Sequence, residues 1–216
     1  MKKLRIGILI SGGGSNMHAI VKACQADDFP VEVAVVISNR PDAQGVQVAK
    51  DEGITSVVVD HKLYADRPAF EVALNAELAK HDVEMVCNAG WMRILTEEFV
   101  NKWLGKQINI HPALLPSYKG LHCHERALAD GVKITGCTVH YVCLEVDAGA
   151  IIAQAAVPVL DDDDATSLAA RVLKAEHQLY PHALRMVADG RAVKVDDIVR
   201  IKSNVEVAPS LFVPRV

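Results

Sequence analysis

Short apolar runs rich in β-branched residues alternate with amphipathic stretches over the first half of the chain, and this alternation constrains the fold most strongly. Strands that alternate with helices form right-handed β-α-β crossovers, which place the strands parallel in one sheet. The expected strands are residues 4–10, 31–37, 55–59, 84–87 and 107–110, and the expected helices are residues 15–26, 43–52, 67–81 and 96–101. The sequence therefore predicts an α/β fold, a Rossmann-like and mainly parallel twisted sheet flanked by helices.

The pattern changes after residue 111. Residues 111–120 contain two prolines and a glycine, and we expect an ordered loop there. Residues 121–130 and about 167–188 are expected to be helices, the second of which ends at Gly190. Between them, residues 134–142 and 151–157 are expected to form antiparallel C-terminal strands.

Composition excludes several classes of protein. The 216 residues are 50% hydrophobic and 23% charged, as in a globular chain, and the formal net charge of −4 does not suit a nucleic-acid-binding face. No apolar run approaches the roughly 20 residues of a membrane span, and Arg5 interrupts the apolar run near the N-terminus, which argues against a signal peptide. Five cysteines without a CxxC pair do not indicate a disulfide framework. We therefore expect a cytoplasmic protein with reduced thiols and without membrane or nucleic-acid partners.

A glycine-rich turn over residues 11–16, Ser-Gly-Gly-Gly-Ser-Asn, joins the first expected strand to the first helix. Backbone N–H groups in such a turn can approach an anion at the helix N-terminus, so the turn indicates a phosphate. Met17 replaces the third glycine of the dinucleotide fingerprint, and the Gly-Lys-Ser/Thr of nucleotide triphosphatases is absent. The alternative is a tight turn without a ligand, in which Ser15 caps the helix.

The most informative segment is Gln-Ile-Asn-Ile-His-Pro at residues 107–112. Residues two apart on a strand share a face, so Asn109 and His111 present an amide and an imidazole together at the carboxyl end of a strand, where open α/β sheets bind ligands. Such a pair can stabilise an oxyanion and move a proton, and a nearby Asp147 would favour imidazolium. The alternative is that the amide and the ring are buried structural groups and Asp147 is a solvated turn acid.

Three other polar features need an interpretation. Glu176 interrupts an apolar stripe in the last helix, so its carboxylate needs either an arginine or a ligand as partner. His122-Cys123-His124 offers metal ligands, but no carboxylate completes a known spacing and no metal site is expected. The acidic residues 161–164 are expected to form a solvated turn before the last helix.

In their order and spacing, these motifs resemble the phosphoribosylglycinamide (glycinamide ribonucleotide) formyltransferases of purine biosynthesis. The resemblance covers about residues 4–191, with matching segments at 10–16, 89–95, 108–116, 120–124, 147–149, 176–177 and 180–181. The departures are Trp91, where the family is expected to have Phe or a similar residue, Asn88 in an otherwise apolar strand, Cys123 and Cys143. They bear on the shape of the folate pocket.

The resemblance implies a formyltransferase fold, with 10-formyltetrahydrofolate as formyl donor, phosphoribosylglycinamide as acceptor and no metal. It implies that Asn109, His111 and Asp147 are catalytic. The nucleotide substrate is assigned to Gly14, Ser15, Asn16, Leu173, Lys174, Ala175 and Glu176. Folate is assigned to Arg67, Met92, Arg93, Ile94, Leu95, Asn109, Cys143, Leu144, Glu145, Val146 and Asp147.

We accordingly expect one formyltransferase domain over residues 1–195. Its nucleotide-binding half is expected at about 1–105, its catalytic and folate half at about 106–195, and a peripheral C-terminal tail at 196–216. The sequence leaves the oligomeric state, monomer or homodimer, open.

Three other functions would fit parts of the sequence. A formyltetrahydrofolate hydrolase would share the core, but the first strand begins by Leu4, without the regulatory domain that usually precedes it. A methionyl-tRNA formyltransferase would need a longer chain with an RNA-binding domain. A non-catalytic Rossmann-like binding module would explain the glycine turn but would leave Asn109, His111 and Asp147 a coincidence.

Overall fold

The computed structural model describes residues 2–202 and residue 213. The chain divides into two compact units, Met1–Asn109 with Tyr141–Leu144, and Ile110–His140 with Glu145–Val216. The strands are β1 (Leu4–Ile10), β2 (Val31–Ser38), β3 (Ser56–Val58), β4 (Met85–Asn88), β5 (Gln107–His111), β6 (Ile134–Tyr141), β7 (Ile151–Pro158), β8 (Ala192–Val195) and β9 (Ile198–Ile201). The helices are α1 (Ser15–Cys24), α2 (Gln44–Asp51), α3 (Arg67–Lys80), α4 (Glu97–Lys102), α5 (Cys123–Ala129) and α6 (Ala165–Ala188), with a 3₁₀ turn η1 at His61–Leu63.

The strand order of the main sheet is β3-β2-β1-β4-β5-β6-β7. The strands of the first unit pair in parallel, and β6 pairs with β7 antiparallel in the second. The predicted α/β class, with a mainly parallel sheet followed by antiparallel strands, is therefore confirmed. The chain passes from the first unit to the second within β5, after Asn109.

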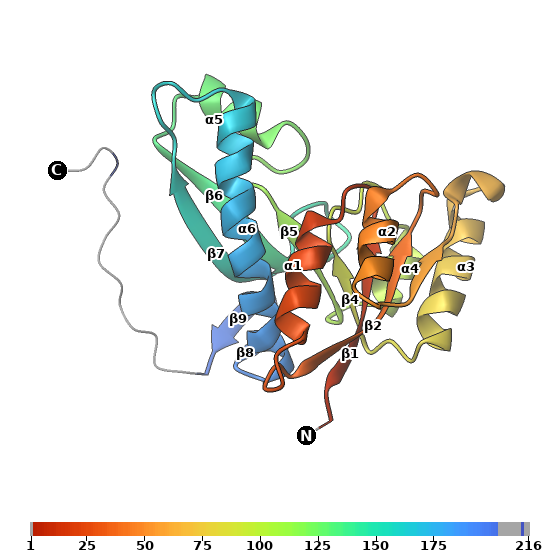
Figure 1. The fold of residues 1–216 in the computed structure, drawn as a ribbon. Coiled ribbons are helices and arrows are strands. Elements are labelled where there is room, and N and C mark those ends of the chain that lie inside the picture. The colour runs from red at the N-terminus through yellow and green to blue at the C-terminus, as the bar shows by residue number, and fades with distance from the viewer. Residues whose placement is uncertain (1, 203–212, 214–216) are drawn as a thin grey trace. The chain divides into compact units, whose positions relative to one another are not determined.

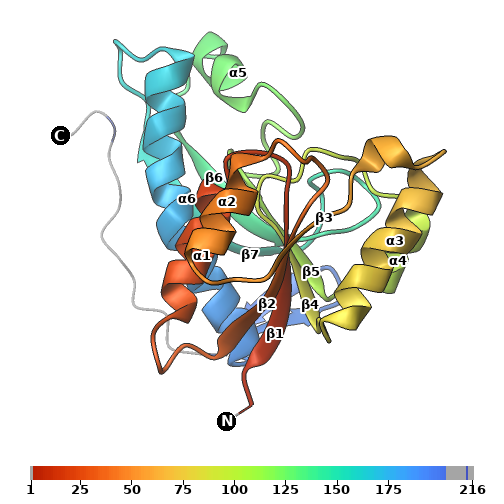
Figure 2. The ribbon, with the colours of Figure 1, turned by 45° about the vertical axis from the view of Figure 1, so that its right-hand side comes forward.

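The first unit has helices on both faces of its parallel strands. Figure 2 shows α1 and α2 on one face and α3 and α4 on the other. Leu9 and Val86 of the strands pack against Phe70 of α3 and Phe99 of α4 in one buried cluster. Burial on both faces explains why these strands read as continuous apolar runs in the sequence.

Short polar side chains begin the helices where the sequence changes from loop to apolar pattern. Asp66 accepts a hydrogen bond from the Ala69 N–H at the start of α3, and Thr96 accepts one from the Phe99 N–H at the start of α4. Such caps satisfy backbone donors that have no partner within the helix. They also explain why the predicted helix starts at residues 67 and 96 lie within one residue of those observed.

The glycine-rich turn caps α1 differently from the alternative considered above. Gly14, with φ of 75°, occupies the N-cap position without a side-chain hydrogen bond, and Ser15 is the first helical residue. A Cβ at Gly14 would lie 2.8 Å from the Cα of Gly45, so both the left-handed backbone and the close approach require glycine. Ser15 as a helix cap is therefore wrong, and its hydroxyl is not used to cap the helix.

The second unit is built on the β6–β7 hairpin and the long helix α6, which lies along it in Figure 1. The predicted apolar stripe of α6 is buried, as is Glu176 within it. Asp164 caps α6, but Asp163 is not solvated as expected. Its carboxylate pairs with Arg171 and its side chain is only 2% exposed.

Part of the C-terminal segment that was expected to be a peripheral tail forms regular structure. Residues 192–201 form the β8–β9 hairpin, which the sequence did not predict as strands. Residues 203–212 and 214–216 of the expected tail lie outside the described residues. In the described part of the chain, no helix has both the length and the apolar character needed to cross a membrane.

A polar cluster connects α1 to the end of α2. The Glu52 carboxylate accepts hydrogen bonds from Lys22 Nζ at 2.8 Å and from Gln25 Nε2 at 2.9 Å, and it lies 3.0 Å from His18 Nε2. The bond from Lys22, followed by the contact with His18, lowers the pKa of Glu52 from its ordinary value of 4.5 to about 2. The ionised carboxylate therefore contributes to stability.

Glu52→Gln should remove this contribution in a pH-dependent way. Because the folded state lowers the pKa, the carboxylate stabilises the fold above pH 4.5, and this stabilisation is lost as pH falls from 4.5 towards 2. In urea denaturation, the loss of unfolding free energy caused by Glu52→Gln should be largest at neutral pH and should shrink across that range. Asp27→Asn, at an exposed position, should show no such change. A pH-independent effect of Glu52→Gln would contradict the prediction.

Candidate active site

The carboxyl end of β5 carries the two polar residues singled out in the sequence. Asn109 is the last residue of the first unit, and His111 ends the strand two residues later. Ile108 and Ile110, which flank Asn109, are buried, and His111 itself is 4% exposed. Pro112 follows directly, and β5 ends at His111. The expected position of Asn109 and His111 at the end of this strand is confirmed.

Within the second unit, the structure brings Asp147 to His111. Asp147 Oδ2 lies 3.2 Å from His111 Nδ1, and the same oxygen accepts a hydrogen bond of 2.9 Å from the Gly120 N–H. Asp147 has a φ of 52°, a left-handed conformation that few non-glycine residues adopt. The proximity expected from the sequence is therefore present, and Asp147 is not a solvated turn acid, since its side chain is only 11% exposed.

Both ring nitrogens of His111 face acceptor atoms. Nδ1 faces the Asp147 carboxylate, and Nε2 lies 2.9 Å from the carbonyl oxygen of Tyr118. A neutral imidazole carries a proton on one nitrogen only, whereas imidazolium can donate from both. The ring is therefore held on both sides, by the Asp147 carboxylate and by the Tyr118 carbonyl oxygen.

Two further side chains touch this pair, and the sequence did not assign either to the site. His140 is buried, and its Nε2 lies 3.6 Å from Asp147 Oδ1. The register of β6 against β7 shifts between Val139 and His140, and such a bulge redirects a side chain. Cys123 Sγ lies 3.5 Å from His111 Nε2. Only one feature of the sequence indicated this role, that His140 lies seven positions before Asp147. The bulge that directs its side chain could not be inferred.

Burial dominates the electrostatics around the His111–Asp147 pair. It raises the pKa of the Cys123 thiol to about 11, against a smaller opposite effect of Arg126. Burial also lowers the pKa of His124, which keeps this imidazole neutral near pH 7. Burial therefore disfavours the charged forms of both Cys123 and His124 beside the pair.

The glycine-rich turn and the segment after β4 are joined within the first unit. The Ser11 N–H donates to the carbonyl oxygen of Gly90 at 3.1 Å, and Ser11 Oγ accepts from the Met92 N–H at 2.9 Å. Ser11 Oγ also donates to Asn39 Oδ1 at 2.7 Å. The expected phosphate-binding turn and part of the expected folate segment therefore share one hydrogen-bond network.

The folate residues predicted in the first unit are a mixture of exposed and buried groups. Met92 and Ile94 are 68% and 64% exposed, large apolar side chains left open to solvent. Arg93 lies over the Phe70 ring at 5.5 Å, and Trp91 stacks on the same ring with centroids 6.1 Å apart. Leu95 packs on the core cluster of the first unit. Arg67, the first residue of α3, is exposed. In the segment after β6, Leu144 is exposed and Cys143 is partly exposed.

The folate residues predicted in the second unit lead into Asp147. Glu145 is exposed and pairs with Lys119 at 2.7 Å, and Val146 is 51% exposed. The polar and apolar side chains that precede Asp147 are therefore open to solvent, whereas the Asp147 side chain is only 11% exposed.

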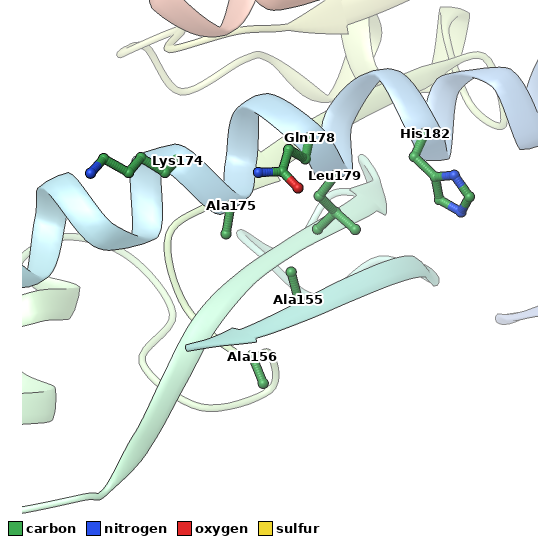
Figure 3. Close-up of a pocket in the computed structure, with 7 residues that line it drawn as sticks. All are labelled: Ala155, Ala156, Lys174, Ala175, Gln178, Leu179 and His182. Carbon is green, nitrogen blue, oxygen red and sulfur yellow. The ribbon is translucent and has the colours of Figure 1, made fainter. Parts of the chain in front are cut away.

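The four residues predicted on α6 do not share one face. Leu173 and Lys174 are exposed, whereas Glu176 is buried. Lys174 and Ala175 line an open pocket of about 530 Å³ together with Ala155 and Ala156 of β7 and Gln178, Leu179 and His182 of α6. Figure 3 shows Ala175 and Leu179 pointing from α6 towards Ala155. The segment therefore divides between this pocket and the buried side of the helix.

The described residues hold no cluster of three or more His, Cys, Asp or Glu side chains suited to a metal ion. His122 and His124, the residues considered above, lie at the start of α5, where His122 is exposed. All five cysteines are free thiols.

Residues 4–184 match the formyl transferase family. The chain is 38% identical over 215 residues to phosphoribosylglycinamide formyltransferase of Haemophilus influenzae, covering all of this chain and 97% of that protein. The crystal structure of glycinamide ribonucleotide transformylase 1 from Symbiobacterium toebii is similar with a TM-score of 0.89 and 45% identity, covering 92% of this chain and 94% of that one.

Longer relatives contain a similar segment. The human trifunctional purine biosynthetic protein adenosine-3 is 47% identical over 189 residues, which cover 88% of this chain. The chain spans only 19% of that protein's length. A formyltetrahydrofolate deformylase from Pseudomonas syringae has a similar fold, with a TM-score of 0.85, but at 26% identity, covering 93% of this chain and 66% of that one.

The raised pKa of Cys123 predicts a slow reaction with alkylating agents. Because burial raises that pKa to about 11, almost none of the thiol is ionised at pH 8, and the thiolate is the reactive form. Iodoacetamide labelling followed by peptide mass spectrometry should modify the partly exposed Cys143 before Cys123 in the native protein. In denaturant the two should react at similar rates. Equal native rates would show that the Cys123 thiol is accessible and ionised.

Proposed function

The chain belongs to the formyl transferase family, and within it to the phosphoribosylglycinamide formyltransferases, and from this premise we propose that it transfers the formyl group of 10-formyltetrahydrofolate to the amine of phosphoribosylglycinamide. The products are the N-formyl nucleotide and tetrahydrofolate, a step of purine (IMP) biosynthesis. We place this reaction in the cytoplasm, with small molecules as partners and no metal in the chemistry.

The observation that carries the proposal is the buried pair of His111 and Asp147 at the end of β5. The two side chains are 3.2 Å apart, and the Gly120 N–H holds the carboxylate in place. Asn109, two residues before His111, adds an amide donor on the same strand. A donor beside a protonated imidazole is the set of groups that an oxyanion intermediate needs.

The proposed chemistry is direct attack by the amine. The nitrogen of the nucleotide forms a bond to the formyl carbon, and the carbonyl oxygen becomes an oxyanion that Asn109 and His111 stabilise. The intermediate collapses when the bond from the formyl carbon to N10 of the folate breaks. N10 gains one proton and the attacking amine loses one, so the balance is closed by proton movement through His111. The amine is itself the nucleophile, and no covalent enzyme intermediate is needed.

The proposed binding residues follow the predicted assignments. Gly14, Ser15 and Asn16 hold the phosphate, and support comes from the Ser15 hydroxyl, which the helix does not use as its cap. On α6, Glu176 is proposed to bind the ribose, with Leu173, Lys174 and Ala175 beside it. Exposed Met92 and Ile94 support a folate site made of residues 92–95, Arg67, Asn109 and residues 143–147.

An assay for release of deformylated folate tests this proposal. Purified protein and 10-formyltetrahydrofolate are followed by absorbance, with and without phosphoribosylglycinamide. Release should require the nucleotide, and the formylated nucleotide should appear in equal amount. Release without the nucleotide would indicate the hydrolase instead. Binding of both ligands to folded protein without any release would indicate a non-catalytic module.

His111→Ala should lower kcat strongly and change the two KM values little, because the ring acts on charge that develops in the transition state. Loss of one such group costs on the order of 3–4 kcal/mol, or about 10² to 10³ in kcat. His81→Ala, at the C-terminal end of α3 and outside every proposed binding segment, is the matched control and should keep full kcat. Circular dichroism would verify that both variants fold. Wild-type turnover of a folded His111→Ala protein would remove His111 from the mechanism.

A further inference from the structure

Two amide side chains lie buried inside the parallel sheet of the first unit. Asn88 ends β4 with 6% exposure, and Gln107 begins β5 with none. Gln107 Nε2 donates a hydrogen bond to Asn88 Oδ1 at 3.0 Å. We call these two residues the amide pair. Interior strands covered on both faces are normally apolar, so two amides there need a reason.

The pairing of β4 with β5 places the amide pair beside Asn109. Val86 is the partner of Gln107 and Asn88 is the partner of Asn109, so these four side chains share one face of the sheet. On its other side Asn88 is the partner of Leu9 in β1, whose side chain is apolar. Among its neighbours at the same level of the sheet, only Asn109 can therefore exchange a side-chain hydrogen bond with Asn88.

The bond from Gln107 also fixes the orientation of the Asn88 amide. Its oxygen accepts from Gln107, which lies two residues before Asn109 along β5. The NH2 group of Asn88 is thus the end directed away from Gln107. A carboxamide beside it is expected to turn its own oxygen towards this donor and its NH2 group away.

The amide pair is costly for stability. Gln107 Oε1 is buried and has no hydrogen-bond partner among the residues that the structure describes. A buried acceptor without a partner costs roughly 1–3 kcal/mol, whereas replacing both members of a buried polar pair by apolar groups is nearly neutral or stabilising. Stability alone therefore does not explain the two amides.

We propose that Asn88, held by Gln107, is a positioning residue that orients the carboxamide of Asn109 so that its NH2 group faces the formyl oxygen. The inference rests on the proposed formyl transfer, in which Asn109 donates to the oxyanion. Asn88 touches neither substrate in this account and acts only through Asn109. Gln107 acts one step further back, by selecting the orientation of Asn88.

The test combines Asn88→Leu with the double variant Asn88→Leu/Gln107→Met. Both should lower kcat by about tenfold to a hundredfold, the range expected when a catalytic donor is misplaced. Both KM values should stay within about twofold. The double variant should melt at the wild-type temperature or above it, because no buried amide is left unpaired. Cys87→Ala, buried on the opposite face of β4, is the matched control and should lower the melting temperature while keeping kcat.

A double-mutant cycle then identifies the route of the effect. In an Asn109→Ala background, Asn88→Leu should cause no further loss of kcat, since the residue through which it acts is gone. The positioning role would be overturned if Asn88→Leu lowered kcat by the same factor with and without Asn109. It would also be overturned if Asn88→Leu/Gln107→Met kept the wild-type kcat. Either result would leave the proposed function intact. Absence of transfer by the wild-type protein would overturn the proposed function, and this inference with it.

Discussion

Parallel pairing of β1, β2, β4 and β5 is the constraint on which the first unit depends. Because the strands run in one direction, their carboxyl ends meet at one edge, and the chain must turn there after every strand. The glycine turn after β1 and the segment after β4 are therefore neighbours, and Ser11 connects them through the backbone of Gly90 and Met92. The same register aligns Asn88 with Asn109. Residues far apart in sequence thus become one polar edge because the pairing of the strands brings them together.

In the second unit the corresponding organising feature is a carboxylate with several contacts. Asp147 contacts His111, His140 and the Gly120 N–H, and its own backbone is held at a positive φ. Burying a carboxylate is unfavourable unless charge and hydrogen bonds compensate it. Here the compensation comes from a histidine at a strand end and a second one at a bulge. This costly arrangement holds His111 in a defined orientation before any substrate binds, which is the pre-organisation that the proposed chemistry needs.

Sequence reasoning succeeded where local patterns and burial agree. The alternation of apolar runs and amphipathic stretches predicted β1 to β7 and α1 to α6 with boundary errors of a few residues. It failed where tertiary contacts override a local tendency. Asp163 belongs to an acidic run, a pattern that indicates a solvated turn. Arg171, eight residues later in α6, pairs with the Asp163 carboxylate, whose side chain is only 2% exposed. Serine is a residue type that often caps helices, so Ser15 was a candidate cap for α1. The close approach of Gly14 to Gly45 instead places Gly14 at the N-cap position. The two strands of the β8–β9 hairpin have four residues each and mix polar with apolar side chains. They are too short to show a clear period in hydrophobicity.

The sequence by itself determined the α/β class, the order of its elements and the motifs by which the chain resembles its family, because strand and helix periods and the residues of the β5 segment are local properties of the chain. Tertiary structure decided which groups meet. The spacing of 36 positions between His111 and Asp147 carries no distance, yet the fold of the second unit places their side chains 3.2 Å apart. His140 reaches the same carboxylate only because a bulge shifts the register of β6. The orientation of the buried Asn88 amide depends on the register of β4 with β5, since hydrogen-bond partners across a sheet are set by how strands pair and not by the identity of either residue.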